Sequence, residues 1–152
     1  MSRSTGVYRR WRPNGIEVLI PTILVYLAES YGKIERVEDG VKLISEALDL
    51  MQPSGACFNE PELHRLKGEL ILLSADSRTE AEFCFLEALN AARHQGAKSL
   101  ELRAVVSLAR LWQKQGNQDK ARNLLSEIYG WFTEGFDTHD LKEAKALLHK
   151  LS

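Results

Sequence analysis

The chain has 152 residues, of which 44% are hydrophobic and 27% are charged, as in an ordinary single globular domain. Its formal charge of −1 argues against a general nucleic-acid-binding protein, because such proteins carry a basic face and a high pI. The apolar run 16–28 contains Glu17 and Pro21 and is shorter than the roughly 20 residues of a membrane span. We therefore expect a soluble, cytoplasmic protein that has no membrane partner.

The first fifteen residues form a basic leader that contains four arginines and no acidic residue. Tyr8 and Trp11 lie among these arginines, so a phosphate-binding arm is one interpretation of residues 1–15. The preferred interpretation is a poorly ordered leader, since chain ends commonly lack fixed structure. Residues 16–152 are then expected to form the folded domain.

Helical periodicity continues through almost all of this domain, and no segment shows the alternation of a half-buried strand. The expected helices cover about residues 16–31, 37–51, 59–73, 79–96, 98–115, 117–129 and 138–151. Asn59 with Glu62, and Thr79 with Glu82, have the spacing of a capping box at a helix start. Asn117 is expected to cap the sixth helix. Glycines end several of the helices, namely Gly32, Gly96 and Gly116.

A repeat relates three pairs of these helices. Small residues at positions 28, 68 and 109 are 40 and 41 residues apart and align the first helices of the pairs. Matching small, large and small or apolar positions follow in the second helices: Gly40, Ile44 and Ala47; Ala81, Phe85 and Ala88; Ala121, Leu125 and Ile128. A small residue lets the paired helix approach, and a large residue fills the space beside it, so this pattern predicts stacked antiparallel helix pairs.

These residues resemble the tetratricopeptide repeat, and the pattern is best kept at Val105–Ile128. The resemblance implies an all-α superhelix with units at about 21–53, 61–95 and 102–135, closed by a capping helix at 138–151. Segments such as 62–70, 97–104 and 129–138 also resemble the C-terminal repeat region of large bacterial regulators that carry cyclase-like and ATPase-like domains. No G-x-x-x-x-G-K-[ST] loop is present in the chain.

The candidates for catalysis each have a simpler interpretation, so we expect neither an enzyme nor a bound metal or cofactor. His139 and Glu143 have a chelating spacing, but a surface pair is the preferred interpretation because a third ligand is missing. His64 falls at a core position of the repeat. Cys84 resembles a buried small apolar residue, and Cys57 lies in a loop without a neighbouring cation.

The aromatic residues Trp131, Phe132 and Phe136 suggest either a ligand cage or, as the preferred interpretation, a plug under the capping helix. The tetratricopeptide resemblance implies that the first helices of the units line a concave groove that binds a peptide or a helix. Carried over through the alignment, the charged and polar groove positions are Glu29, Glu62, Arg65, Glu69, Arg103, Arg110, Gln113 and Lys114. Val25, Leu72 and Val106 fall on the same face.

Two interpretations of the groove charges stay open. Arg65, Arg110 and Lys114 form a cationic cluster that suits a partner's carboxylates. Alternatively, Arg103 and Arg110 pair with Glu62, Glu69 or Glu101 as ordinary surface ion pairs. The leading function is a non-catalytic protein-interaction module, with a role in regulation. The alternatives are a self-associating structural unit, such as a homodimer, and a small-ligand sensor.

Overall fold

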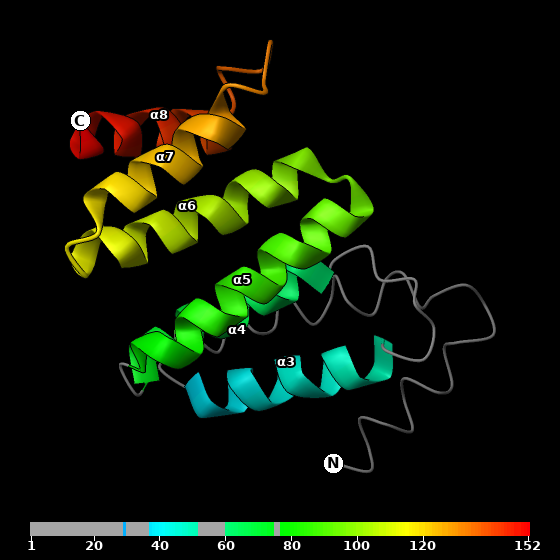
Figure 1. Cartoon of the computed structure of the whole chain (residues 1–152). Helices are drawn as coiled ribbons and strands as arrows, with labels where there is room; N and C mark the ends of the chain where they lie inside the picture. Colours follow the sequence, from blue (N-terminus) through cyan, green and yellow to red (C-terminus); the bar gives the residue numbers. More distant parts are fainter. Residues whose placement is uncertain (1–28, 30–36, 52–59, 75–76) are drawn as a thin grey trace.

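The computed structural model describes residue 29 and residues 37–51, 60–74 and 77–152. All of the regular structure in these ranges is α-helical, which confirms the predicted all-α class. The helices are α3 (Val37–Met51), α4 (Glu60–Ser74), α5 (Arg78–Gln95), α6 (Lys98–Lys114), α7 (Gln118–Tyr129) and α8 (His139–Leu151) (Figure 1). The predicted basic leader, and the predicted first helix apart from Glu29, lie outside the described residues.

The glycine signals for helix ends are confirmed at Gly96 and Gly116, whose φ angles are +69° and +86°. This left-handed conformation lets the chain fold back, so that the Ala97 amide donates to the Ala92 carbonyl at 2.9 Å. The capping box at Thr79 was predicted wrongly. Helix α5 begins at Arg78, after Ser77, and has no side-chain capping bond.

Asn117 occupies the predicted capping position of α7, but its side chain makes no capping hydrogen bond. The Ala121 amide instead donates to the Asn117 backbone carbonyl at 3.1 Å, the first bond of the helix. Thr138 precedes α8, and its hydroxyl donates to the Gly135 carbonyl at 2.7 Å. The starts of α5, α6, α7 and α8 therefore have no side-chain capping hydrogen bond.

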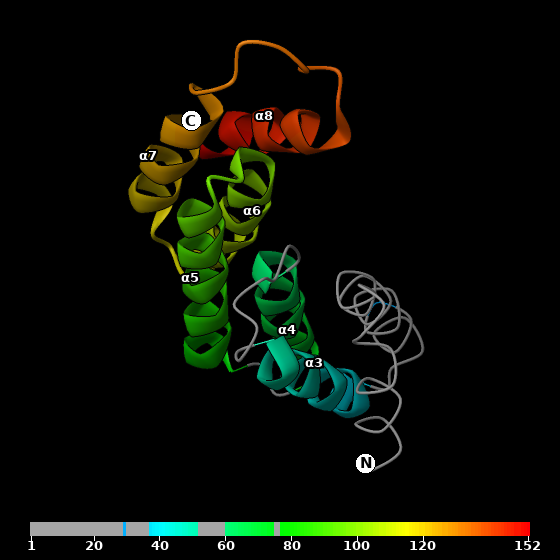
Figure 2. The same cartoon turned by 90° about the vertical axis from the view of Figure 1, so that its right-hand side faces the viewer.

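Each helix packs against the next along the chain, from α3 to α8. In addition, α4 contacts α6, and α6 contacts α8. Seen from the side, α4, α6 and α8 lie on one side of the stack and α5 and α7 on the other (Figure 2). The alternate helices α4, α6 and α8 therefore share a face.

The aligned positions of the second helices are buried in all three predicted units. The nine aligned small and apolar positions there are all buried: Gly40, Ile44, Ala47, Ala81, Phe85, Ala88, Ala121, Leu125 and Ile128. The small residues Gly68 and Ala109 of the first helices are also buried. Small residues thus lie where paired helices come closest, as the steric argument requires.

Helix α8 ends this part of the stack. It buries Leu141, Ala144, Leu147 and Leu151 in the main core, against α6 and α7. Its outward side is polar and exposes Lys142, Lys145, His149 and Lys150. The helix is therefore amphipathic, with its apolar side on α6 and α7. No helix within the described ranges is long and apolar enough to cross a membrane.

Candidate functional site

A polar network connects α4 and α6 on their shared face, and the carboxylate of Glu62 is at its centre. Glu62 is only 6% exposed. Its two oxygens accept hydrogen bonds from Arg65 Nε at 2.8 Å and Nη2 at 2.7 Å, in a two-point fork. Arg103 Nη1 lies 2.6 Å from the same carboxylate. A buried carboxylate needs such partners, because removing its charge from water without them destabilises the fold by about several kcal/mol.

Ser107 extends the network towards the middle of the two helices. Its hydroxyl donates to Glu69 Oε2 at 2.9 Å and accepts a 3.4 Å hydrogen bond from Arg65 Nη1. Arg65 Nη1 also lies 3.7 Å from Glu69. Arg65 therefore contacts Glu62 and Glu69 of α4 and the Ser107 hydroxyl of α6, and these contacts hold its side chain in place.

The environment of Arg65 also includes Glu29. Although burial lowers the pKa of Arg65, hydrogen bonding and attraction from Glu62 raise it overall, with smaller contributions from Glu69 and Glu29. Glu29 therefore lies close enough to act electrostatically on the network. It is half-buried, and its neighbours in sequence lie outside the described residues.

Helix α8 supplies two further carboxylates to this face. Asp140 Oδ1 lies 3.7 Å from Arg103 Nε, and Glu143 contacts Arg110 Nη2. The hydrogen bond from Arg110 is the main reason that the pKa of Glu143 is lowered. A shallow recess of about 40 Å³ lies among these side chains. It is lined by Arg65, Arg103, Val106, Ser107, Arg110, Asp140 and Glu143.

Five of the eight predicted groove residues thus come together: Glu62, Arg65, Glu69, Arg103 and Arg110. Gln113 and Lys114 lie further along α6 and do not line this recess. Sequence reasoning missed Ser107, Asp140 and Glu143 as members of the network. Treating α8 as one more first helix of the array would have placed its carboxylates beside α6.

The predicted cationic cluster differs from the structure, because its arginines already hold carboxylates of the same chain. Arg65 binds Glu62 and Glu69, and Arg110 binds Glu143. Of the alternative surface ion pairs, the pair of Arg103 with Glu62 is present, although the Glu62 side chain is only 7% exposed. Arg110 contacts Glu143 instead, and Glu101 is contacted by Arg93 and Lys98 at 3.0 and 3.1 Å.

The residues considered for catalysis differ in their burial and contacts. Burial lowers the pKa of His64, despite a 3.4 Å contact with Glu60 that favours the charged form. Cys84 is a core residue, as predicted, and burial raises the pKa of its thiol, which disfavours the nucleophilic thiolate. His139 contacts Glu143 at 2.9 Å at an exposed position. No three metal-ligating side chains gather within the described part of the chain, and Cys57 lies outside it.

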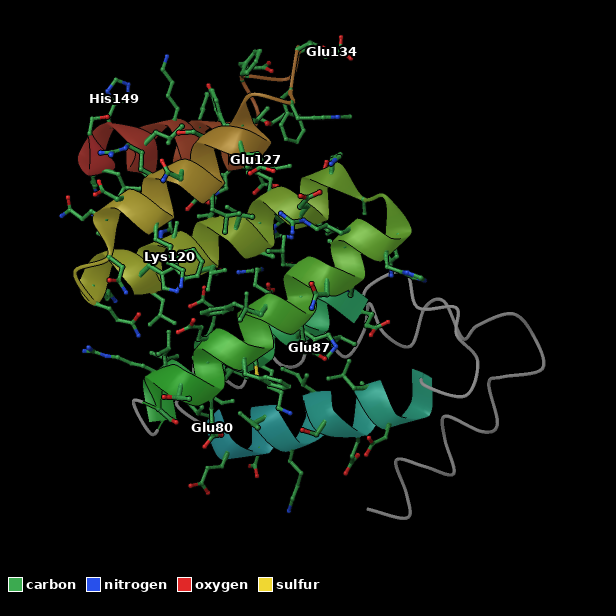
Figure 3. All side chains as sticks on the ribbon, viewed as in Figure 1. Glu80, Glu87, Lys120, Glu127, Glu134 and His149 are labelled. Atoms are coloured by element: carbon green, nitrogen blue, oxygen red, sulfur yellow. The ribbon has the colours of Figure 1, made fainter. Side chains whose placement is uncertain are left out.

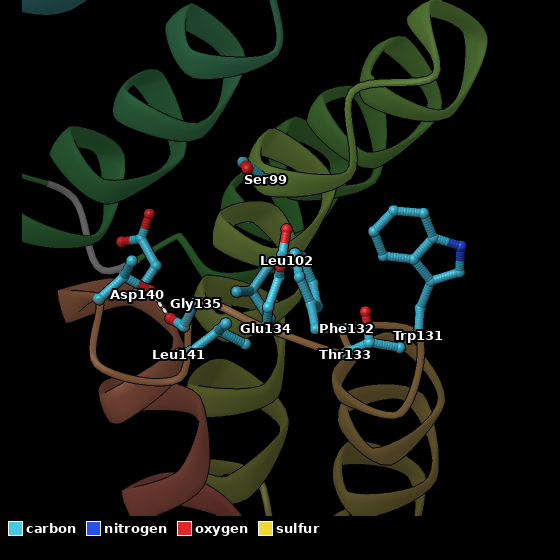
Figure 4. Close-up of a pocket in the computed structure, with 10 residues that line it drawn as sticks. Ser99, Leu102, Trp131, Phe132, Thr133, Glu134, Gly135, Asp140 and Leu141 are labelled. Carbon is cyan, nitrogen blue, oxygen red and sulfur yellow. Dashed lines mark hydrogen bonds between the residues drawn. The ribbon is translucent and has the colours of Figure 1, made fainter.

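A second, larger recess of about 420 Å³ opens between the start of α6, the segment 131–138 and the start of α8 (Figure 4). The aromatic plug was predicted wrongly for Trp131 and Phe136, whose side chains are 56% and 44% exposed. Phe132 is half-buried and packs against the core. The Trp131 and Phe132 rings meet edge to face, with their centroids 5.2 Å apart.

Comparison with known proteins adds no relative. The chain matches no protein-family model and no curated protein. The geometry of the two recesses on and beside the α4–α6–α8 face is therefore the basis for a function.

Proposed function

We propose that the chain is a non-catalytic protein-interaction module, an array of helix pairs of the tetratricopeptide type. Its binding face is formed by α4, α6 and α8, and it takes an extended peptide or a helix of a partner protein. The observation that carries this proposal is the convergence of polar side chains from three alternate helices on one face. The buried repeat positions support an array of helix pairs. In such an array the first helices of successive pairs can line one surface.

The network makes the face a prearranged surface. Glu62 and Arg65 are largely buried and fix each other, whereas Arg103 and Arg110 are 36% and 47% exposed at the side chain. The guanidinium groups of Arg103 and Arg110 have further N–H donors that a partner can use. The carboxylates of Glu62 and Glu143 hold these guanidinium groups in a fixed orientation. Prearranged groups bind more tightly, because less side-chain entropy is lost on association.

The charge balance of the face indicates what it recognises. Three arginines meet four carboxylates, which belong to Glu62, Glu69, Asp140 and Glu143. A strongly acidic partner would therefore meet repulsion as well as attraction. We expect recognition through hydrogen bonds to a peptide backbone and polar side chains. The proposed contact residues are Glu29, Glu69, Arg103, Arg110, Gln113 and Lys114, and the largely buried Glu62 and Arg65 hold the arginines of this face in place.

Selection from a random peptide library displayed on phage, with the full chain as bait, tests this proposal. We expect selected peptides to bind saturably and to lose affinity roughly tenfold on the Arg110→Glu substitution, since central charged contacts give about 1.4 kcal/mol or more. Lys145→Glu is the matched control, because it reverses an exposed positive charge on the outward side of α8. Circular dichroism establishes that both variants are folded.

Two outcomes would overturn the proposal. One is the absence of any saturable peptide from the selection. The other is a set of peptides whose affinities respond equally to Arg110→Glu and to Lys145→Glu, because binding would then occur away from the α4–α6–α8 face.

Self-association is a second candidate function, and exposed apolar side chains on α5 favour it. Phe83 is 64% exposed and Leu86 is 37% exposed, and the two are three residues apart on one side of the helix. Burying them against a second copy would remove apolar surface from water. Light scattering tests this: the candidate requires a dimer that becomes a monomer on Phe83→Ser.

A further inference from the structure

The 420 Å³ recess has an apolar floor and an aromatic wall. Leu102 and Leu141 are 1% and 3% exposed and form part of its lining together with Phe132. Trp131 and Asp140 lie at opposite ends of the recess, and Glu134 lies between them in this view (Figure 4). An elongated ligand group with an apolar stem would therefore contact apolar side chains along its length and a carboxylate at its end.

The charges around the recess indicate that the end of the bound group is positively charged. Ten residues line the recess; two of them, Glu134 and Asp140, are acidic, and none is basic. Arg103 approaches Asp140 only to 3.7 Å, at half-exposed positions where solvent weakens the pair. Lys98 Nζ lies 5.5 Å from the centre of the Trp131 ring, but Glu101 holds this ammonium at 3.1 Å. The lining itself thus carries two negative charges.

We propose that this recess is a side-chain pocket for an arginine or lysine of the partner peptide. The methylene stem lies beside Trp131 and on Leu102, Phe132 and Leu141, and the cationic end lies near the Asp140 carboxylate, with Glu134 between the two ends. Packing of the stem beside an aromatic ring, combined with charged hydrogen bonds at its end, suits these two side chains. The volume exceeds that of a single side chain, which leaves room for water beside it.

The recess adjoins the binding face proposed above, because Asp140 lines both recesses. A peptide that follows α4, α6 and α8 would reach the pocket at the N-terminal end of α8. This inference rests on the proposed function and adds a required residue type to the partner. It also gives Trp131 and Glu134, which the first recess does not use, a role in binding.

The test uses four capped tripeptides in which the central residue is arginine, lysine, leucine or glutamate between glycines. Binding to the full chain is followed by the NMR signal of the Trp131 indole N–H, assigned with Trp131→Phe. We expect the arginine and lysine peptides to shift this signal saturably, in the millimolar range typical of one side-chain contact. The leucine and glutamate peptides should bind at least roughly fivefold more weakly.

Substitutions then locate the charge. The double variant Glu134→Gln, Asp140→Asn should weaken the arginine peptide roughly fivefold or more, whereas Glu127→Gln should leave it unchanged. Glu127 is an exposed acid on α7 that does not line the recess (Figure 3). Leucine binding as strong as arginine binding, a preference for the glutamate peptide, or an unshifted indole signal would each overturn the inference.

Library peptides separate this inference from the proposed function. Peptides that bind the α4–α6–α8 face, weaken on Arg110→Glu and lack any basic residue would refute the side-chain pocket while the interaction module stands. Selected peptides that share an arginine or lysine, and lose affinity on the Glu134 and Asp140 double substitution, would support both.

Discussion

Gly68 on α4 lies against the ring of Phe85 on α5, so that a β-carbon at position 68 would be 2.6 Å from Phe85 Cε1 and 2.8 Å from Cδ1. Phe85 is fully buried and is the largest of the fully buried side chains. The ring therefore has no free space into which it can turn. The closest approach of this helix pair depends on the missing side chain of the glycine.

We expect Gly68→Ala to lower the free energy of unfolding by about 1–3 kcal/mol, the usual cost of overpacking a core. Alanine is the better helix former by about 1 kcal/mol, so helix propensity alone predicts the opposite sign. Denaturant unfolding of the full chain, followed by circular dichroism, measures the change. In a Phe85→Leu background the same substitution should cost clearly less, because the ring that it meets is gone. Equal costs in the two backgrounds would contradict the steric explanation.

Two ion pairs with the same sequence spacing and contact distance should contribute differently to stability, because one is buried and the other is exposed. Arg65–Glu62 and Arg122–Asp119 both join residues three apart with a 2.7 Å contact, and both acids lie in the first turn of a helix. The Glu62 side chain is 7% exposed, and that of Asp119 is 86% exposed. We expect Glu62→Gln to cost about 2–4 kcal/mol, because two arginines lose a buried partner.

The matched substitution Asp119→Asn should cost less than about 1 kcal/mol, as an exposed pair does. Denaturant unfolding again gives both values. If the two substitutions had equal effects on stability, the Glu62 network would not contribute through its burial.

His64 should make the protein less stable in weak acid. Burial lowers the pKa of His64 in the folded chain below its ordinary value of 6.5, so the unfolded chain binds the proton first. The free energy of unfolding should therefore be independent of this group above pH 6.5 and should decrease as the pH falls below it. One proton limits the slope to about 1.4 kcal/mol per pH unit.

The His64→Gln variant should lose this part of the pH dependence when unfolding is measured between pH 7.5 and pH 5, roughly one pH unit or more either side of the ordinary histidine pKa. The exposed His149→Gln on α8 is the control and should keep the parent slope. A His64→Gln slope identical to that of the parent would show that the buried imidazole is not responsible.

Glu143 should act in the same sense as His64, but at lower pH. Its pKa is lowered in the folded chain by Arg110, so its stabilising contribution is present above the ordinary carboxyl pKa and is lost as the pH falls through the folded value. The pKa of Glu143 from carbon-detected NMR should rise on Arg110→Ala and stay constant on Lys145→Ala. An unchanged pKa in Arg110→Ala would refute the pairing of α6 with α8.

Cys84 should react only after unfolding. In a Cys57→Ala variant, the aromatic disulfide reagent DTNB should detect no thiol in the native chain and one thiol in guanidinium chloride. The reason is that burial both shields the sulfur and raises the pKa of its thiol. Rapid reaction of native Cys84 would show that α5 opens readily from the core.

Local signals in the sequence determined the helices of the described residues, since apolar periodicity and glycine ends depend on neighbours within a few positions. They also indicated which positions of the second helices are buried, since Ala81, Phe85 and Ala88 are apolar residues at helical spacing. The capping box predicted at Thr79 is absent, although Thr79 and Glu82 have its spacing. Helix α5 begins at Arg78, before Thr79, so this short pattern alone did not locate the helix start.

Only the tertiary structure decided how the groove charges are used. Arg103 and Arg110 are separated from Asp140 and Glu143 by more than thirty positions, and the packing of α8 on α6 brings them together. The exposure of Trp131 likewise depends on where the segment before α8 passes, which apolar periodicity does not encode. Charge and hydrophobicity are properties of single residues, whereas pairing and enclosure belong to surfaces that form only when the helices are stacked.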